Sequence, residues 1–237
     1  MTDRHVIVDA IRKLQKLYSD IESISFTSNI QRTVILAHGW YVAANRTATA
    51  IMLLETRGLG HEAAPLRRSL IEHAVALGWL TQATEDAANS LLRGYQELNI
   101  KKLKQVFDQV APEKAAMFND ILDVEVAASS EDHYLAFRHL CNRFGTQRIY
   151  AEWLRNTGLS HATYASAMAY TTASGEDINL SREPNQTPDA STEIATMLLL
   201  ASHHFNELLE NKPWTSILEE IEDQVRKAMS TKTRGDT

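Results

Sequence analysis

The chain has few of the residues that cross-link a fold or interrupt helices. Its 237 residues include one cysteine, five prolines and nine glycines, and 7% are aromatic. The lone cysteine, Cys141, excludes an internal disulfide framework and a Cys-rich zinc site, and it fits a reducing compartment. Long stretches without proline or glycine are rich in alanine, leucine and glutamate, a composition that predicts α-helices.

An excess of basic residues and a long apolar run are also missing. The 30 acidic residues outnumber the 24 basic ones, and the formal net charge of -6 argues against non-specific coating of nucleic acid or anionic membranes. No apolar run approaches the ~18 residues of a membrane span, and the charged start MTDRHVIVDAIRKLQKLY does not resemble a secretory signal. We therefore expect a soluble, cytoplasmic protein with no membrane partner.

Helical periodicity is what the sequence contains along most of its length. Apolar residues make up 44% of the chain, which is enough for a full core, and no segment of any length alternates with the period of a strand. We expect an all-α fold, a single bundle of about eight to ten helices without a sheet. This domain would cover residues 1–230 and be followed by a disordered tail at 231–237, although two domains remain an alternative.

Caps, prolines and glycines mark the ends of the expected helices. These lie at about 3–21, 28–57, 61–82, 84–110, 112–129, 133–144, 147–155, 161–172, 192–210 and 214–229. The polar, aperiodic stretch 173–191 is expected to be the one long loop. In the second segment, Ala37, Ala44 and Ala48 allow a neighbouring helix to approach closely, so this segment is expected to be central and to offer a dimerisation surface.

The segment YAEWLRNTGLSHATYASAMAY, residues 150–170, carries the most chemistry. Gly158 is predicted to end one helix and Ser160 to cap the next, so that His161 lies in a first turn. A helix N-terminus offers unpaired N–H groups to an anion, and Arg155 is suited to clamp a phosphate with two hydrogen bonds. This pattern predicts a phosphate site at Arg155 and His161.

Arg155, Asn156 and, after four further residues, His161 resemble the catalytic motif of HEPN (higher eukaryotes and prokaryotes nucleotide-binding) domains. These all-helical proteins include metal-independent ribonucleases of toxin–antitoxin and phage-defence systems. The resemblance implies that a ribose 2′-hydroxyl attacks the adjacent phosphorus: His161 would transfer protons, Arg155 would neutralise phosphoryl charge and Asn156 would orient the phosphate or ribose. It also implies RNA as substrate, an antitoxin or other protein partner, and a homodimer.

A plainer interpretation stands beside this one. An arginine and a histidine within seven residues are common, and a glycine-broken helix pair with a serine cap is ordinary architecture. The neighbouring aromatic residues, Tyr150, Trp153, Tyr164 and Tyr170, are typical of a core, although base stacking is a second role open to them. The alternative function is a non-catalytic helical scaffold that binds a protein partner or a small ligand between helices.

A second polar group lies on the expected helix 61–82. Arg68 and Glu72 stand four residues apart, so they are expected to form an ion pair on a face turned to the interior, where removal of one partner would cost ~3 to 5 kcal/mol. On a continuous helix, a five-residue step turns about 140°, which separates His73 from Arg68 and makes it incidental.

A wider pattern joins this helix to the later segment. RSLIE after a small-residue helix, followed much later by Leu-Ser-His and a tyrosine, resembles an uncharacterised family of bacterial helical proteins known only as a domain of unknown function. The likeness covers about the middle two-thirds of the chain, far more than a short motif. It implies that Arg68, Glu72, Ser160 and His161 are the recurrent polar residues, and we expect Arg68, Glu72, Ser160 and the downstream Tyr164 to form a binding or structural polar network.

A metal site is the weakest possibility in the sequence. His204 and Glu207 lie three apart on one late helix, but the order His-x-x-Glu is the reverse of that in carboxylate-bridged di-iron bundles. The adjacent His203 and His204 point about 100° apart on a helix, so both cannot easily bind one ion. We expect no metal and no cofactor.

Overall fold

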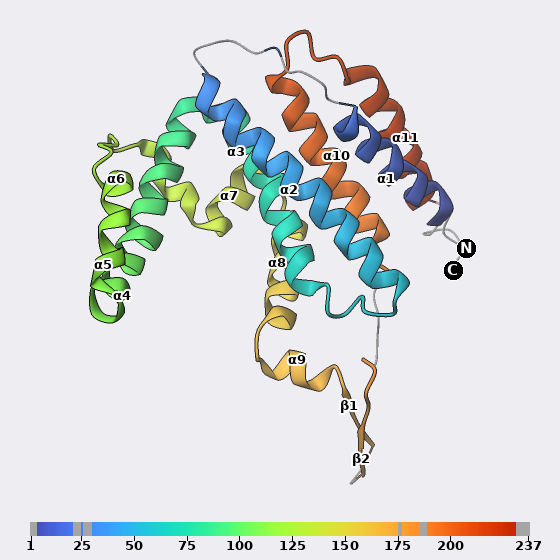
Figure 1. The fold of residues 1–237 in the computed structure, drawn as a ribbon. Coiled ribbons are helices and arrows are strands. Elements are labelled where there is room, and N and C mark those ends of the chain that lie inside the picture. Colours follow the sequence, from blue (N-terminus) through green and yellow to red (C-terminus); the bar gives the residue numbers. More distant parts are fainter. Residues whose placement is uncertain (1–3, 21–24, 26–29, 175–176, 185–188, 231–237) are drawn as a thin grey trace.

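The computed structural model describes residues 4–20, 25, 30–174, 177–184 and 189–230. Its longer helices are α1 (Arg4–Ser19), α2 (Gln31–Thr56), α3 (Ala64–Tyr95), α4 (Lys101–Val110), α7 (Phe137–Phe144), α8 (Gln147–Ser160), α10 (Ser191–Leu208) and α11 (Thr215–Ser230) (Figure 1). The shorter elements are a π-helical turn (Gln96–Ile100), α5 (Pro112–Ala115), α6 (Asn119–Leu122), α9 (Tyr164–Met168) and 3-10 turns at Ala116–Phe118 and Ser130–Leu135. The expected all-α bundle is confirmed.

The expectation that the chain has no sheet was wrong. Two short strands, β1 (Thr171–Ser174) and β2 (Asp177–Leu180), pair antiparallel as a hairpin that begins at the end of the expected helix 161–172 and continues into the stretch expected to be a loop. β-branched residues such as Thr171, Thr172 and Ile178 favour extended backbone. The strands have four residues each, too few for their period to stand out in the sequence.

The core lies where α2, α3 and α10 pack together, with α1 and α11 against α10 and with α8 against α3 (Figure 1). Ala37, Ala44 and Ala48 are fully buried, which confirms that α2 is central. It also shows that the expected dimerisation surface on these alanines was wrong, because they face other helices of the same chain. Tyr41 stacks on Phe205 with ring centroids 4.6 Å apart.

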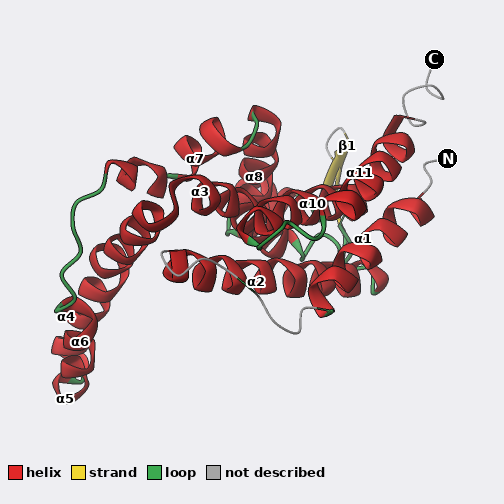
Figure 2. Ribbon diagram, turned by 90° about the horizontal axis from the view of Figure 1, so that it is seen from above, coloured by secondary structure: helices red, strands yellow, loops and turns green. Residues whose placement is uncertain are grey.

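The third and fourth expected helices are joined in α3 but kinked at the expected break. Thr84 has φ 44° and ψ -117°, outside helical geometry, and the helix resumes directly after it. The half before Thr84 lies in the core, and the half after it runs outward to α4 (Figures 1 and 2). The expected helix 112–129 was wrong in its length, since this segment forms the short turn α5, the 3-10 turn Ala116–Phe118 and α6, which ends at Leu122.

The expected helix break at Gly158 was also wrong. α8 continues through Gly158 to Ser160, and His161 is its C-cap residue with φ -117° and ψ 166°. The next helix, α9, begins at Tyr164 and is capped by Thr163, whose hydroxyl accepts a hydrogen bond from the Ser166 N–H. Glycine lowers helix propensity by only about 1 kcal/mol, which the packing of α8 on α3 outweighs. His161 therefore does not lie in the first turn of a helix.

Two expectations remain, the extent of the domain and the absence of a membrane span. The tail 231–237 lies outside the described residues, so the proposed single domain over 1–230 stays a prediction. Among the described residues, no helix is both long enough and apolar enough to cross a bilayer.

Candidate functional site

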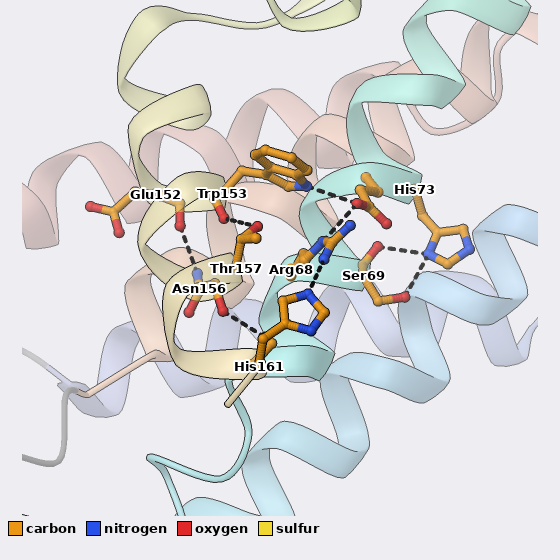
Figure 3. A network of polar contacts seen from close by, with 10 residues as sticks. Arg68, Ser69, His73, Glu152, Trp153, Asn156, Thr157 and His161 are labelled. Carbon is orange, nitrogen blue, oxygen red and sulfur yellow. Dashed lines mark hydrogen bonds and ion pairs between the residues drawn. The ribbon is translucent and has the colours of Figure 1, made fainter. Parts of the chain in front are cut away.

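The polar side chains of interest gather where α8 packs against the first half of α3 (Figure 3). They form two groups. One group, the Arg68 site, consists of Arg68, Glu72, Trp153 and His161 and reaches the surface. The other, the Arg67 network, consists of Arg67, Glu152, Arg155, Asn156 and Glu193 and begins in the core.

In the Arg68 site, Glu72 holds two neighbours with one oxygen. Its Oε1 accepts a hydrogen bond from Arg68 Nε at 3.0 Å and another from Trp153 Nε1 at 2.8 Å. The Arg68 guanidinium carbon lies 4.9 Å from the centroid of the Trp153 ring, within the range of a cation–π contact. Arg68 is therefore fixed by a carboxylate and by an aromatic ring.

His161 completes this site from the end of α8. Arg68 Nη1 lies 3.1 Å from His161 Nε2, and the two side chains point toward one another (Figure 3). Because a guanidinium can only donate, Nε2 is the acceptor in this arrangement and the ring proton lies on Nδ1. His73 turns away from this contact, with Nδ1 2.7 Å from the Ser69 carbonyl oxygen, in agreement with the prediction that it is incidental.

The expected ion pair between Arg68 and Glu72 is confirmed, but its expected burial was wrong. The side chains are 29% and 38% exposed, respectively. The buried stripe of α3 contains Leu70 and Ile71 instead. Ion pairs this open to water contribute about 1 kcal/mol or less, so the expected penalty of a fully buried pair does not apply.

The buried arginine is the preceding residue, Arg67, which the sequence analysis did not select. It is fully buried, with Nε donating to Asn156 Oδ1 at 3.0 Å and Nη1 donating to the Gly60 carbonyl at 2.6 Å. Burial lowers the pKa of Arg67, against the attraction of Glu193. The sequence contained a signal for this burial, because Arg67 precedes Leu70 and Ile71 by three and four residues and so lies on their apolar face of the helix.

Asn156 connects Arg67 to α10 and is itself fully buried. Its Nδ2 donates to Glu193 Oε1 at 3.2 Å and to the Glu152 carbonyl at 3.0 Å. Burial raises the pKa of Glu193, and Arg67 and Arg155 act in the opposite direction. Both the oxygen and the nitrogen of the Asn156 amide are therefore hydrogen-bonded inside the protein, and no donor of this side chain is directed at solvent. This arrangement is typical of a structural residue.

Arg155 and His161 do not converge within this chain. Arg155 binds Glu152, with Nη2 2.6 Å from Oε2, and its Nη2 also lies 3.8 Å from Glu193 Oε2. Since α8 is continuous through Gly158, six positions turn about 600°, which leaves these two residues roughly 120° apart around the helix. The predicted phosphate clamp of Arg155 and His161 is therefore not formed by one copy of the chain.

Two further predicted residues lie outside the Arg68 site. Ser160 Oγ donates to the Asn156 carbonyl at 2.5 Å, a bond within α8, and Tyr164 is 82% exposed. Tyr170 lies elsewhere, donating from its hydroxyl to Glu62 Oε1 at 2.5 Å, and this bond raises the pKa of Tyr170 to about 12. The structure thus brings Arg68 and Glu72 together, but it does not place Ser160 and Tyr164 in contact with them.

Arg155 instead lines a cleft of about 1120 Å³ between α8, α10 and α11. The charged lining residues are Arg148, Glu152, Arg155, Asp189, Glu193 and Arg226. Apolar side chains from the same helices complete the wall, including Ile149, Met197 and Met229. This cleft has three guanidinium groups and three carboxylates next to an apolar surface, a combination that suits a ligand with both a polar and an apolar part.

The histidines of α10 separate as expected for neighbours on a helix. His203 Nε2 lies 3.6 Å from Glu222 Oε2, whereas the His204 ring packs on Gly78. In the part of the chain that the structure describes, no group of three metal-ligating side chains gathers. Cys141 is buried, and burial raises the pKa of its thiol to about 11, as for a small core residue.

Comparison with known protein families gives a match over the middle of the chain. The model of a family described as "Family of unknown function (DUF5677)" matches residues 34–176. This range runs from α2 through β1 and contains the Arg68 site, in agreement with the resemblance to a domain of unknown function over the middle of the chain. Comparisons with curated proteins and with solved structures give no match.

Proposed function

The chain belongs to the family of unknown function (DUF5677), and we propose that it binds RNA and cleaves it without metal at the Arg68 site. The observation that supports this proposal is the 3.1 Å contact between Arg68 Nη1 and His161 Nε2 at the surface. It places a permanent cation beside an imidazole nitrogen that can accept a proton, the pair needed to bind and transform a phosphodiester. Arg68 thus takes the role that the sequence analysis gave to Arg155.

A phosphodiester would act on this contact directly. A phosphoryl oxygen bound by Arg68 replaces His161 Nε2 as the acceptor, which frees Nε2 to take the proton of the adjacent ribose 2′-hydroxyl. The 2′-oxygen then forms a bond to phosphorus, and the bond from phosphorus to the 5′-oxygen breaks as that oxygen takes a proton from solvent. The products are a 2′,3′-cyclic phosphate and a 5′-hydroxyl.

Glu72 and Trp153 support Arg68 in this scheme. Glu72 holds Nε, so the Nη groups remain directed outward to stabilise charge on the phosphoryl oxygens. The Trp153 ring lies against the guanidinium and restricts its motion. Both residues are positioning residues, since neither contacts the reacting atoms.

Cleavage of a labelled single-stranded RNA in EDTA tests the proposal. We expect 2′,3′-cyclic phosphate ends, and a loss of at least about 10²-fold in rate for His161→Ala and for Arg68→Lys, which keeps the charge but cannot bind two phosphoryl oxygens in fixed geometry. His73→Ala is the matched control and should cut at the wild-type rate. Absence of cleavage by the wild type, or unchanged cleavage by purified His161→Ala, would refute the assignment.

Arg155→Ala separates this proposal from the HEPN-like motif as first expected. If Arg68 supplies the cation, Arg155→Ala retains cleavage, because Arg155 contacts Glu152 and Glu193 on a different side of α8. Inactivation by Arg155→Ala together with full activity of Arg68→Lys would instead show that Arg155, as in the HEPN-like motif, supplies the cation that binds the phosphate. That result would require His161 and Arg155 to come from two copies of the chain.

The cleft between α8, α10 and α11 supports a second candidate, a non-catalytic scaffold that binds a small ligand. An anionic naphthalene sulfonate dye tests it, because the dye has a sulfonate for Arg155 and an apolar body for the wall of the cleft. Arg155→Ala should weaken dye binding while leaving RNA cleavage intact, and Arg57→Ala on the exposed end of α2 should change neither. Equal dye binding by all three proteins would contradict this role.

A further inference from the structure

The segment between the core and α7 projects from the body of the molecule. We call residues 96–125 the arm; it contains the π-helical turn, α4, α5 and α6 (Figures 1 and 2). Hydrogen bonds join the two ends of the arm, since Gln96 Nε2 donates to the carbonyl oxygens of Ile121 and Val124. α4 contributes no buried residue to the fold.

α4 nevertheless has an apolar stripe. Leu103, Val106 and Val110 are 45%, 55% and 71% exposed, and their spacing of three and four residues places them on one face. Among the apolar residues of this helix, Phe107 is the one that is partly covered, and it packs on Phe118 with ring centroids 5.4 Å apart. A contiguous exposed apolar stripe on a projecting helix is typical of a surface that another chain covers.

The charges around the stripe indicate that the chain covering it is a second copy of this protein. Lys102 precedes the stripe and Glu113 follows it, and neither has an ion-pair partner among the described residues, whereas Lys101 and Lys104 pair with Glu97 and Asp108. A twofold axis between Val106 and Phe107 would place Leu103 opposite Val110 of a second copy. The same axis places the basic first turn of α4, which contains Lys102, beside the end of the second copy's α4, where α5 begins with Pro112 and Glu113, in both directions at once.

We propose that the arm is a self-association surface, on which α4 packs antiparallel against α4 of a second copy of this chain. The contact is isologous: one apolar stripe meets its own copy, and two Lys102–Glu113 pairs close its ends. Its small size places it with weak interfaces, so monomer and dimer should exchange with concentration. This inference does not depend on the proposed function.

Sedimentation equilibrium on the full chain, from about 1 to 200 µM, tests the surface. The mass should rise from 26.6 kDa toward twice that value. Val106→Asp should raise the dimer dissociation constant at least about a hundredfold with unchanged circular dichroism, because it places two carboxylates beside the twofold axis in the apolar contact. Leu53→Asp, at a side chain 62% exposed on α2, is the control and should dimerise as the wild type does.

Charge exchange tests the register. Lys102→Glu and Glu113→Lys should each weaken the dimer, and the double variant should recover it, because only a second copy carries the complementary change. A wild type that stays monomeric at every concentration would overturn the proposal. So would a dimer that survives Val106→Asp, or a double variant weaker than both single ones.

Discussion

Asn156→Leu tests whether Asn156 is structural or catalytic. The change leaves the volume of the side chain similar but removes the acceptor of Arg67 Nε and the donor to Glu193 Oε1. Arg67 would retain only Gly60, since its Nη2 has no acceptor among the described residues. An unsatisfied buried donor costs ~1 to 3 kcal/mol, and more when it is charged, so we expect a loss of about 3 to 4 kcal/mol.

Urea unfolding followed by circular dichroism measures this loss. Asn142→Leu, at an exposed asparagine of α7, is the matched control and should stay within about 0.5 kcal/mol of the wild type. Arg67→Met combined with Asn156→Leu should recover part of the loss, because the unpaired charge is then gone. A loss under about 1 kcal/mol for Asn156→Leu would contradict this reasoning, because it would show that water reaches Arg67.

Three other variants test how much single side chains contribute to the stability of the fold. Glu72→Ala should cost about 1 to 2 kcal/mol in urea unfolding, for a solvated ion pair plus one hydrogen bond, and a loss near 4 kcal/mol would contradict the exposure of the site. Burial lowers the pKa of His73 below its usual 6.5, so the unfolded chain binds this proton more readily and stability is lost as the pH falls below 6.5. His73→Gln should flatten that fall, which has a slope of up to about 1.4 kcal/mol per pH unit, while His5→Gln at an exposed position should not. Gly78→Ala should cost ~1 to 3 kcal/mol in thermal unfolding, because a Cβ there would lie 2.8 Å from His204 Nε2, and an unchanged melting temperature would mean that the ring moves freely.

The fold class was predictable because helical periodicity persists over most of the chain, and local signals also located the break at Thr84. Gly158 was misread, because a single glycine carries a modest helix penalty that tertiary packing can exceed. The hairpin at β1 and β2 was missed, because its strands are too short for their period to be recognised.

The candidate site was predictable only in part. The step of four residues between Arg68 and Glu72 fixes their contact within one helix, whatever the rest of the chain does. The contact between Arg68 and His161 spans 93 positions, and the Arg67 network needs α10 as well as α8. Contacts between different helices depend on how the helices pack, which the local sequence pattern does not predict. Arg67 was recoverable, since a cation on an apolar stripe indicates a buried partner.

Thr84 gives the kink in α3 a further consequence. A non-glycine residue at φ 44° and ψ -117° costs of order 1 to 3 kcal/mol, a strain sustained by packing on both sides. This one residue sets the direction in which the arm leaves the core. If two arms pair as proposed, the two Thr84 joints fix the span between the two Arg68 sites. An RNA long enough to bridge that span would engage both sites at a high effective concentration, and a shorter one would not.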